Sequence, residues 1–342
     1  MENYRMLAPQ SRGSFAERLS ELHDIMARFL ENEQAEGRTL QYAKVFMSDI
    51  QNQDADFRAS RLYNSLLSGT ALTVVEQPPL DASKITVLAK TADRQPEFIF
   101  HSLRLTPEET RGYNSYLQTM RLFEKYIECI TAKGLDIRTH LVRTWIYVAD
   151  IDVNYEGVVK ARNDVFRQYG LTADTHYIAS TGIGGYSATR PESVAIDFLT
   201  YPGITADNLY YLQALDHLNP THEYGVAFER GTRLTNGGTQ HFFISGTASI
   251  DNHGEVMHVG DVEGQVHRLL ENIRALLADG GATMDDVRYF IVYLRDPSDH
   301  QLVSTLMQRL HPQVPHVIVH AKVCRPAWLV EMECVAVKEQ QQ

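Results

Sequence analysis

Residues 241–338 read HFFISGTASIDNHGEVMHVGDVEGQVHRLLENIRALLADGGATMDDVRYFIVYLRDPSDHQLVSTLMQRLHPQVPHVIVHAKVCRPAWLVEMECVAVK. From Val262, apolar residues recur at helical spacing, and Gly280-Gly281 follow where that helix would end. Residues 287–294 read as a buried strand, and a second helical segment and two strand-like segments follow. The stretch therefore predicts an α+β unit with the order strand, helix, strand, helix, strand, strand.

The middle of this unit recurs twice upstream in weakened form. Each copy has an amphipathic helix, a glycine that ends it, a strand, and an aspartate after the strand. The helix and strand ranges are 15–29 with 42–47, 116–127 with 140–148, and 262–277 with 287–294, and the aspartates are Asp49, Asp150 and Asp296. We expect these aspartates to cap helices or turns. Three copies predict three modules, with boundaries at 1–95, 96–205 and 206–342 and with sites in the seams between them.

The chain has 342 residues and a net charge of −11, from 32 basic and 43 acidic side chains. This charge disfavours a nucleic-acid binder, which usually presents a basic face. No apolar run approaches the length of a membrane span, and the N-terminus lacks a signal-peptide pattern. The three cysteines and 14 histidines show no zinc or other ligand spacing. We therefore expect a cytoplasmic protein that uses no metal and no cofactor.

The last third of the chain resembles the YjgF/Rid superfamily, whose members include the endoribonuclease L-PSP-like proteins. The matching pieces are Ser245-Gly246, Gly260-Asp261, Gln265, Asn272-Ile273, Gly281-Ala282, Asp286-Val287 and Leu329-Val330-Glu331. The resemblance implies chorismate-mutase-like α+β units, in which mixed sheets are backed by helices. Such units normally form homotrimers with sites between subunits. Three fused units therefore imply a single-chain pseudo-trimer that is monomeric or weakly dimeric.

Two strings also resemble the chorismatase branch of that superfamily, fused enzymes that remove the enolpyruvyl group of chorismate. They are SGTASIDNHGEVMHVGDVEGQ (245–265) and VCRPAWLVEME (323–333). The tripeptide before His253 and residues 161–170 depart from that branch. The Pro-x-Arg of Rid deaminases, whose arginine holds the substrate carboxylate, is replaced here by Pro315-His316-Val317.

The closing strand contains Glu331, the candidate catalytic acid. Successive side chains of a strand point to opposite faces. Glu331 therefore lies on one face of the strand, and the other face carries the small apolar residues expected beneath the helices, Val330, Met332, Cys334 and Ala336. Its carboxyl group would then face the surface on which Rid-like units meet. Burial there would raise its pKa, as a general acid requires. A solvated or ion-paired glutamate fits the same pattern.

Arg325 and Cys324 precede this strand and are candidate substrate contacts. Arg325 shares the strand parity of Glu331, and it could grip a carboxylate with two parallel hydrogen bonds or simply pair with Glu331. Cys324 has the opposite parity and is expected in the pocket wall as a small buried hydrophobe. A nucleophilic cysteine paired with His316 or His320 is the less favoured interpretation.

The remaining candidate contacts come from three other segments. Ser245-Gly246 are expected at a tight bend that ends a strand, where glycine permits close approach of a ligand. Thr181-Gly182 belong to a glycine-rich stretch that forms either a substrate-facing loop or a turn. Arg143 and Tyr147 lie four apart on one strand face, from which they would reach the same seam.

The residues and the resemblance together imply an enzyme that releases pyruvate from chorismate or a related cyclic carboxylic acid. Glu331 would donate the proton, and the ligand would be a small anionic cyclic acid or keto acid. Two other classes stay open. One is a Rid-type enamine or imine deaminase or an L-PSP-type endoribonuclease, and the other is a non-catalytic protein that binds a small carboxylate. No nucleic-acid or membrane partner is expected.

Overall fold

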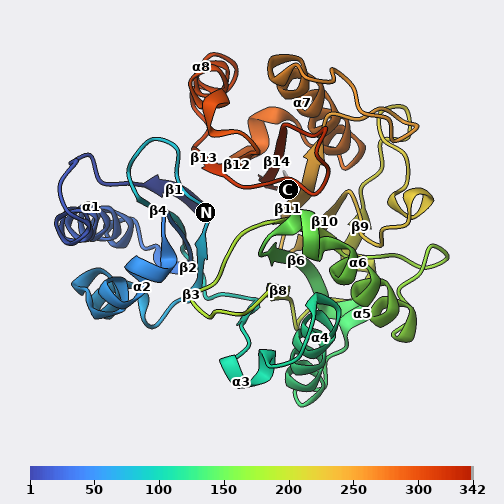
Figure 1. The fold of residues 1–342 in the computed structure, drawn as a ribbon, viewed down its shortest axis with the longest axis horizontal. Helices are drawn as coiled ribbons and strands as arrows, with labels where there is room; N and C mark the ends of the chain where they lie inside the picture. The colour runs from blue at the N-terminus through green and yellow to red at the C-terminus, as the bar shows by residue number, and fades with distance from the viewer. Residues whose placement is uncertain (340–342) are drawn as a thin grey trace.

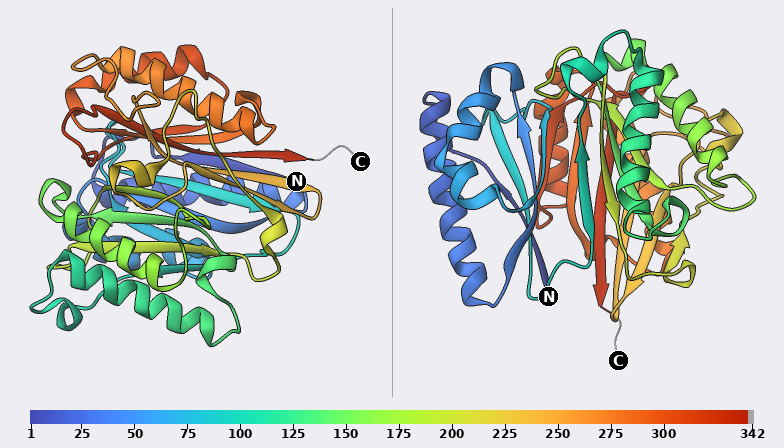
Figure 2. Two further views of the ribbon diagram at one scale, coloured as in Figure 1. Left: turned by 90° about the vertical axis from the view of Figure 1, so that its right-hand side faces the viewer. Right: turned by 90° about the horizontal axis from the view of Figure 1, so that it is seen from below.

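The computed structural model describes residues 1–339. Three sheets lie around a common centre, and their helices form the outside of the molecule (Figure 1). The side views show the strands running together through the middle with helices on the flanks (Figure 2). The predicted α+β class and the mixed sheets backed by helices are confirmed.

Residues 2–92 form the first sheet and its helices. In chain order the elements are β1 (Glu2–Leu7), α1 (Phe15–Ala35), β2 (Thr39–Met47), α2 (Ile50–Ala59), the π-helical turn η1 (Leu62–Leu67), β3 (Ala71–Glu76) and β4 (Ile85–Ala92). Helix α1 begins with a capping box in which Ser14 and Glu17 exchange hydrogen bonds, and it buries Leu22 and Met26 against the sheet.

Residues 99–200 form the second sheet and its helices. In chain order the elements are β5 (Ile99–Leu103), α3 (Pro107–Thr110), α4 (Ser115–Thr131), α5 (Ile137–His140), β6 (Leu141–Val148), α6 (Ile151–Gln168), β7 (Ala179–Gly184) and β8 (Val194–Thr200). The phenyl ring of Phe123 on α4 packs edge-on against Phe166 of α6 and Phe198 of β8, which holds both helices on the sheet.

Residues 209–339 form the third and largest sheet. In chain order the elements from residue 206 onward are η2 (Ala206–Asn208), β9 (Leu209–Tyr211), η3 (Thr221–Tyr224), β10 (Gly231–Asn236), β11 (Thr239–Ala248), α7 (Val262–Asp279), η4 (Met284–Asp286), β12 (Val287–Leu294), η5 (Pro297–Asp299), α8 (His300–Leu310), β13 (His316–His320) and β14 (Val330–Glu339). Strand β12 has the predicted bounds, and β9 and β10 add two strands that the repeat pattern did not predict.

One topology recurs in all three sheets. The strand orders are β1-β4-β2-β3, β5-β8-β6-β7 and, within the larger sheet, β11-β14-β12-β13. In each case the first two pairings are antiparallel and the last is parallel. The parallel pair is joined through a helix on the outer face, as a parallel connection requires. The predicted order of strand, helix, strand, helix, strand, strand is therefore present three times.

The three aspartates that follow the second strand of each unit have structural roles. Asp49 caps α2 by accepting a hydrogen bond from the Asn52 amide, and Asp296 accepts one from the Ser298 amide at η5. Asp150 precedes α6 with a left-handed backbone (φ 45°), and its carboxylate accepts the Tyr186 hydroxyl instead of capping the helix. Two of the three are therefore helix caps, and the third fixes a turn.

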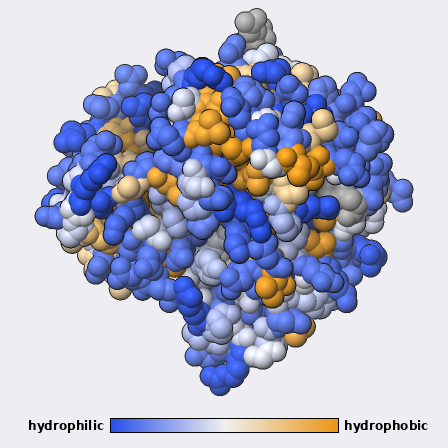
Figure 3. All heavy atoms as spheres, turned by 45° about the horizontal axis from the view of Figure 1, so that its top comes forward, coloured by the Kyte–Doolittle hydropathy of each residue, from blue (hydrophilic) through white to orange (hydrophobic). Residues whose placement is uncertain are grey.

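The units meet through buried polar contacts as well as apolar packing. Thr73 of β3 donates a hydrogen bond to Asp197 of β8 at 2.7 Å, and His241 of β11 pairs with Glu2 of β1 at 3.0 Å. Among residues 1–339, no helix is long and apolar enough to cross a membrane. On the face shown in Figure 3, hydrophobic side chains form small patches separated by polar ones.

Candidate active site

A pocket lies in the seam between the second and third sheets. Residues of α6 and β7 form one wall, and residues of β11, β14 and the loop before β14 form the other. Its lining is Tyr155, Arg162, Ser180, Gly182, Val226, Phe228, Arg230, Gly246, Ala248, Ile250, Cys324, Arg325, Trp328 and Glu331. Five of the nine residues singled out from the sequence are therefore in one pocket. The cavity is small, with a volume of about 40 Å³.

Glu331 is buried in this pocket, with 4% of its surface exposed. It lies opposite Ala248 of β11 and Tyr293 of β12 in the sheet, so its side chain projects from the middle of the sheet into the seam. Burial raises the pKa of Glu331, the Glu333 carboxylate raises it further, and Arg143 and Arg230 only partly oppose this, so that the pKa is about 8. The carboxyl group is therefore protonated at neutral pH.

Gly246 provides the space that the Glu331 carboxyl group occupies. A Cβ atom added at residue 246 would lie 1.9 Å from Glu331 Oε1. The pairing of β11 with β14 shifts register between Ile244 and Thr247, which marks a β-bulge at this point. Residues 245–247 were expected to end a strand at a tight bend; β11 ends one residue later, at Ala248, and the irregularity within it is this bulge. The bulge re-aims the backbone without ending the strand.

Arg143, Ser245 and Thr181 form a hydrogen-bonded layer behind the pocket. The Arg143 guanidinium donates to Ser245 Oγ at 3.2 Å, to Thr181 Oγ1 at 2.6 Å and to Glu333 Oε2 at 3.0 Å. Thr181 Oγ1 also accepts the Gly246 amide at 3.0 Å. The structure therefore places Arg143 beside Glu333, and Arg143 does not line the pocket. Its positive charge reaches Glu331 only through space.

Arg325 lies at the mouth of the pocket, and Cys324 lies in its wall. Arg325 precedes β14, so strand alternation does not apply to it, and its exposed guanidinium lies 5.3 Å above the Trp328 ring. Burial raises the pKa of the Cys324 thiol to about 12, with a smaller contribution from Glu331. A thiol with that pKa is protonated at neutral pH, which argues against a nucleophilic role.

Tyr147 lies away from this pocket. Its ring packs 5.1 Å from Lys44 Nζ and 5.6 Å from the Arg104 guanidinium, in the seam toward the first sheet. It shares a strand face with Arg143, as its spacing predicted, but the strand is long enough for its two ends to reach different neighbours. Gly182 does line the pocket, where the Tyr155 ring would lie 3.1 Å from an added Cβ.

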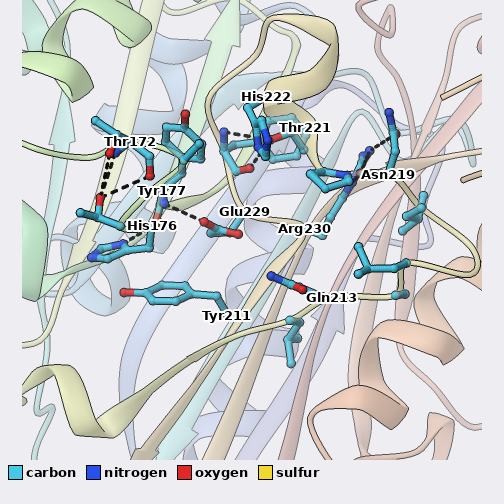
Figure 4. Close-up of a pocket in the computed structure, with 18 residues that line it drawn as sticks. Thr172, His176, Tyr177, Tyr211, Gln213, Asn219, Thr221, His222, Glu229 and Arg230 are labelled. Carbon is cyan, nitrogen blue, oxygen red and sulfur yellow. Dashed lines mark hydrogen bonds between the residues drawn. The ribbon is translucent and has the colours of Figure 1, made fainter. Parts of the chain in front are cut away.

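A second pocket adjoins the first and shares Phe228 and Arg230 with it. Figure 4 shows its polar lining, in which the Tyr177 amide donates to Glu229 at 2.6 Å and Arg230 donates to Asn219 at 2.9 Å. This second pocket has a larger volume, about 160 Å³, but Glu331 does not line it. Among residues 1–339, no group of three or more His, Cys, Asp or Glu side chains could hold a metal ion.

Known proteins are similar to part of this chain and to the whole of it. The family model described as Endoribonuclease L-PSP matches residues 232–338, which include β11, β14 and the Glu331 side of the pocket. We call residues 232–338 the L-PSP unit, because this model matches them. The 3-aminoacrylate deaminase RutC of Acinetobacter baylyi is 28% identical to this chain over 96 residues, which are 28% of this chain and 76% of RutC.

Beyond the L-PSP unit, a crystal structure of a chorismatase matches the whole chain. It is 19% identical, covers 98% of both chains and superposes with a TM-score of 0.69, so the two proteins share a fold over their full length. A putative endoribonuclease of Thermotoga maritima MSB8, 24% identical, covers 38% of this chain and 98% of its own, with a TM-score of 0.32.

Three further pocket residues, which the sequence did not single out, lie outside the L-PSP unit. Arg162 of α6 is 2% exposed and lies 5.6 Å from the Phe228 ring, and Arg230 is held by Asn219. Tyr155 of α6 is partly buried beside Cys324. A signal for Arg162 was present, because it falls on the apolar face of its helix between Val158 and Phe166. No comparable pattern marks Arg230.

Proposed function

We propose that this protein is a chorismatase-like enzyme. It removes the enolpyruvyl group of chorismate or a related cyclic carboxylic acid and releases pyruvate, with Glu331 as proton donor. The observation that carries the proposal is a buried carboxylic acid, protonated at neutral pH, in a pocket that three arginines also line. The shared fold with a chorismatase over the full length supports it.

The arginines suit a substrate with more than one carboxylate. Arg162, Arg230 and Arg325 line the pocket, and the acid beside them is neutral, so the pocket is cationic. Guanidinium groups bind carboxylates well because their parallel N–H donors match the two oxygens. A ring that carries two acidic groups is larger than the cavity. Its entry therefore requires side chains at the mouth to move, and exposed Arg325 on Trp328 is placed to do so.

The chemistry follows from the protonated acid. Glu331 transfers its proton to the methylene carbon of the enol ether, which yields an oxocarbenium-like cation and the Glu331 carboxylate. Water adds to the cationic carbon and returns a proton to Glu331, and the resulting hemiketal collapses to pyruvate and the ring alcohol. Direct loss of pyruvate with aromatisation of the ring would begin with the same proton transfer. A carboxylic acid in a water-excluded cleft lowers the barrier most at this first proton transfer.

The test is pyruvate release from chorismate by purified protein. We expect Glu331→Gln to lower kcat by about 10²- to 10⁴-fold, because the amide cannot donate the proton. The matched control is Glu339→Gln, the same change on the same strand at an exposed position. Absence of pyruvate from the wild-type reaction, or equal rates for wild type and Glu331→Gln, would contradict the proposal. Analysis of the ring product distinguishes hydrolysis from aromatisation.

A deaminase is the second candidate, favoured by the similarity of part of this chain to RutC, a protein named as a 3-aminoacrylate deaminase. The segment Pro315-His316-Val317 lacks the arginine expected of Rid deaminases, and His316 begins β13 at the sheet edge. Ammonia release from 2-aminoacrylate generated in place would favour this function. Turnover of 2-aminoacrylate that survives Glu331→Gln, with no turnover of chorismate, would replace the first proposal by the second.

A further inference from the structure

Glu333 lies two residues after Glu331 on the same face of β14 and is 2% exposed. Two acids on one face of a strand, both buried at a seam, cannot both ionise cheaply. We propose that Glu333 is a positioning residue whose fixed carboxylate keeps the neighbouring Glu331 carboxyl group protonated without touching the ligand. The consequence for catalysis rests on the proposed function, but the electrostatic coupling does not.

The geometry distinguishes the two acids. Glu333 Oε2 accepts from Arg143 Nη2 at 3.0 Å, and Glu333 Oε1 accepts from Trp145 Nε1 at 2.8 Å. Both donors come from β6 of the second unit. Glu333 does not line the pocket, whereas Glu331 does. One carboxylate is therefore clamped by two donors from another unit, and the other is directed into the pocket.

Lys44 adds a second cation on the Glu333 side. Its Nζ is buried and has no hydrogen-bond partner among residues 1–339, and it lies 5.1–5.9 Å from the rings of Phe46, Trp145 and Tyr147. Burial raises the pKa of Glu333, but Arg143, Lys44 and hydrogen bonds from Thr181 and Trp145 outweigh it, so the pKa is lower than usual. Glu333 therefore stays ionised over the range in which Glu331 titrates.

Other charged and titratable groups face the two acids. The charged neighbours of Glu331 are Arg143 of β6 and Arg230 before β10, and those of Glu333 are Arg143 and Lys44. Arg162 and Arg325 also line the pocket. The titratable neutral groups around both acids are Tyr42, Tyr155, Tyr289, Tyr293, Cys324 and Cys334. The tyrosines and cysteines all have a raised pKa, caused chiefly by burial, so they stay neutral in this range. Burial lowers the pKa of Lys44 to about 8, so Lys44 loses its charge in the same range as Glu331. The constant charge near Glu331 is then set by the arginines and by Glu333.

The test reads the protonation of Glu331 directly and needs no substrate. Protein with ¹³C-labelled glutamate carboxyl carbons is titrated by NMR, and Glu331→Gln identifies the signal. In the wild type we expect the Glu331 signal to titrate near pH 8 and the Glu333 signal to remain that of a carboxylate. A Glu331 signal already that of a carboxylate at pH 6 would overturn the proposal, whatever the enzyme does with chorismate.

In Glu333→Gln the midpoint of Glu331 should fall by about one pH unit or more, because a neighbouring negative charge is lost while Arg143 remains. Glu333→Asp keeps the charge and should restore most of the shift, and Glu339→Gln should leave the midpoint unchanged. If Glu333→Gln does not fold, Glu333→Gln with Lys44→Met removes one buried charge of each sign and carries the same expectation. An unchanged midpoint in either variant would rule out the coupling. If the protein turns over chorismate, the pH at which activity falls on the alkaline side should decrease in Glu333→Gln by the same amount as the Glu331 midpoint. A purely structural role of Glu333 would not shift this pH.

Discussion

A single buried carboxyl group carries the chemistry proposed for this molecule. Glu331 is an acid on an inward-facing strand position, and the alternation of β14 was enough to predict which way it points. The alternation could not predict how dry the seam is or that Glu333 lies beside it as a carboxylate. Those two facts together raise the pKa to about 8. The same residue in a solvated strand would be an ordinary ionised glutamate.

The raised pKa has a consequence for stability. Below about pH 4.5 Glu331 is protonated in both folded and unfolded chains; between about 4.5 and 8 only the folded chain holds the proton. Stability therefore falls as pH rises through this window, by about 1.4 kcal/mol per unit at most. Since Glu331→Gln cannot ionise, its free energy of unfolding should increase relative to wild type from pH 5 to pH 8. Urea unfolding at several pH values measures this, and a difference independent of pH would show that Glu331 is not protonated in the folded protein.

Strand β11 shows how one irregularity in an element creates a site. Its bulge at residues 244–247 brings the Gly246 backbone against the Glu331 carboxyl group, and the Gly246 amide is held by Thr181 of the next unit. A regular strand would place a side chain on one face or the other at this position. The bulge and the absence of a Cβ atom leave room for the acid.

Gly246→Ala tests this arrangement. The added methyl group would lie 1.9 Å from Glu331 Oε1, so the acid or the strand must move. We expect a loss of about 1–3 kcal/mol in stability and a large drop in pyruvate release. Gly69→Ala is the matched control, because nothing lies within 4 Å of a Cβ atom there and its φ is not left-handed. Equal activity and stability of the two variants would show that the Glu331 carboxyl group does not need a glycine at position 246 to make room for it.

At the scale of the whole molecule, the seams between three similar units hold the buried charges. Arg143 and Glu333 join the second and third units, with both side chains 2% exposed. Removing one partner of a buried ion pair leaves the other charge without compensation. The pair therefore makes the second and third units depend on each other for stability.

Arg143→Met should lower the free energy of unfolding by about 3–5 kcal/mol, because Glu333 is left buried and unpaired. Arg167→Met is the control, since Arg167 is exposed and its pair with Asp164 is worth about 0–1 kcal/mol. Adding Glu333→Met to Arg143→Met should recover part of the loss. Urea unfolding of the four proteins measures these differences, and similar losses for both single variants would exclude the seam as a source of stability.

Local patterns predicted the main elements, though not β9 and β10, and together with the family resemblance they indicated five residues of the pocket. Helical spacing and a terminal glycine predicted α7, a continuous apolar run predicted β12, and the recurrence of both predicted three units of one topology, because these signals arise within about twenty neighbouring residues. Strand alternation predicted the direction of Glu331 for the same reason.

The composition of the pocket depended on contacts between distant segments. Arg162 of the second unit lines the pocket of Glu331 across a seam, Arg143 turns toward Glu333, and Tyr147 packs against Lys44 of the first unit. No short-range pattern specifies which neighbour a buried side chain meets when three units pack together. Strand alternation gave the direction of the acid. Its protonation and the arrival of Arg162 require the second and third units to pack together, because desolvation and through-space charge belong to the assembled seam.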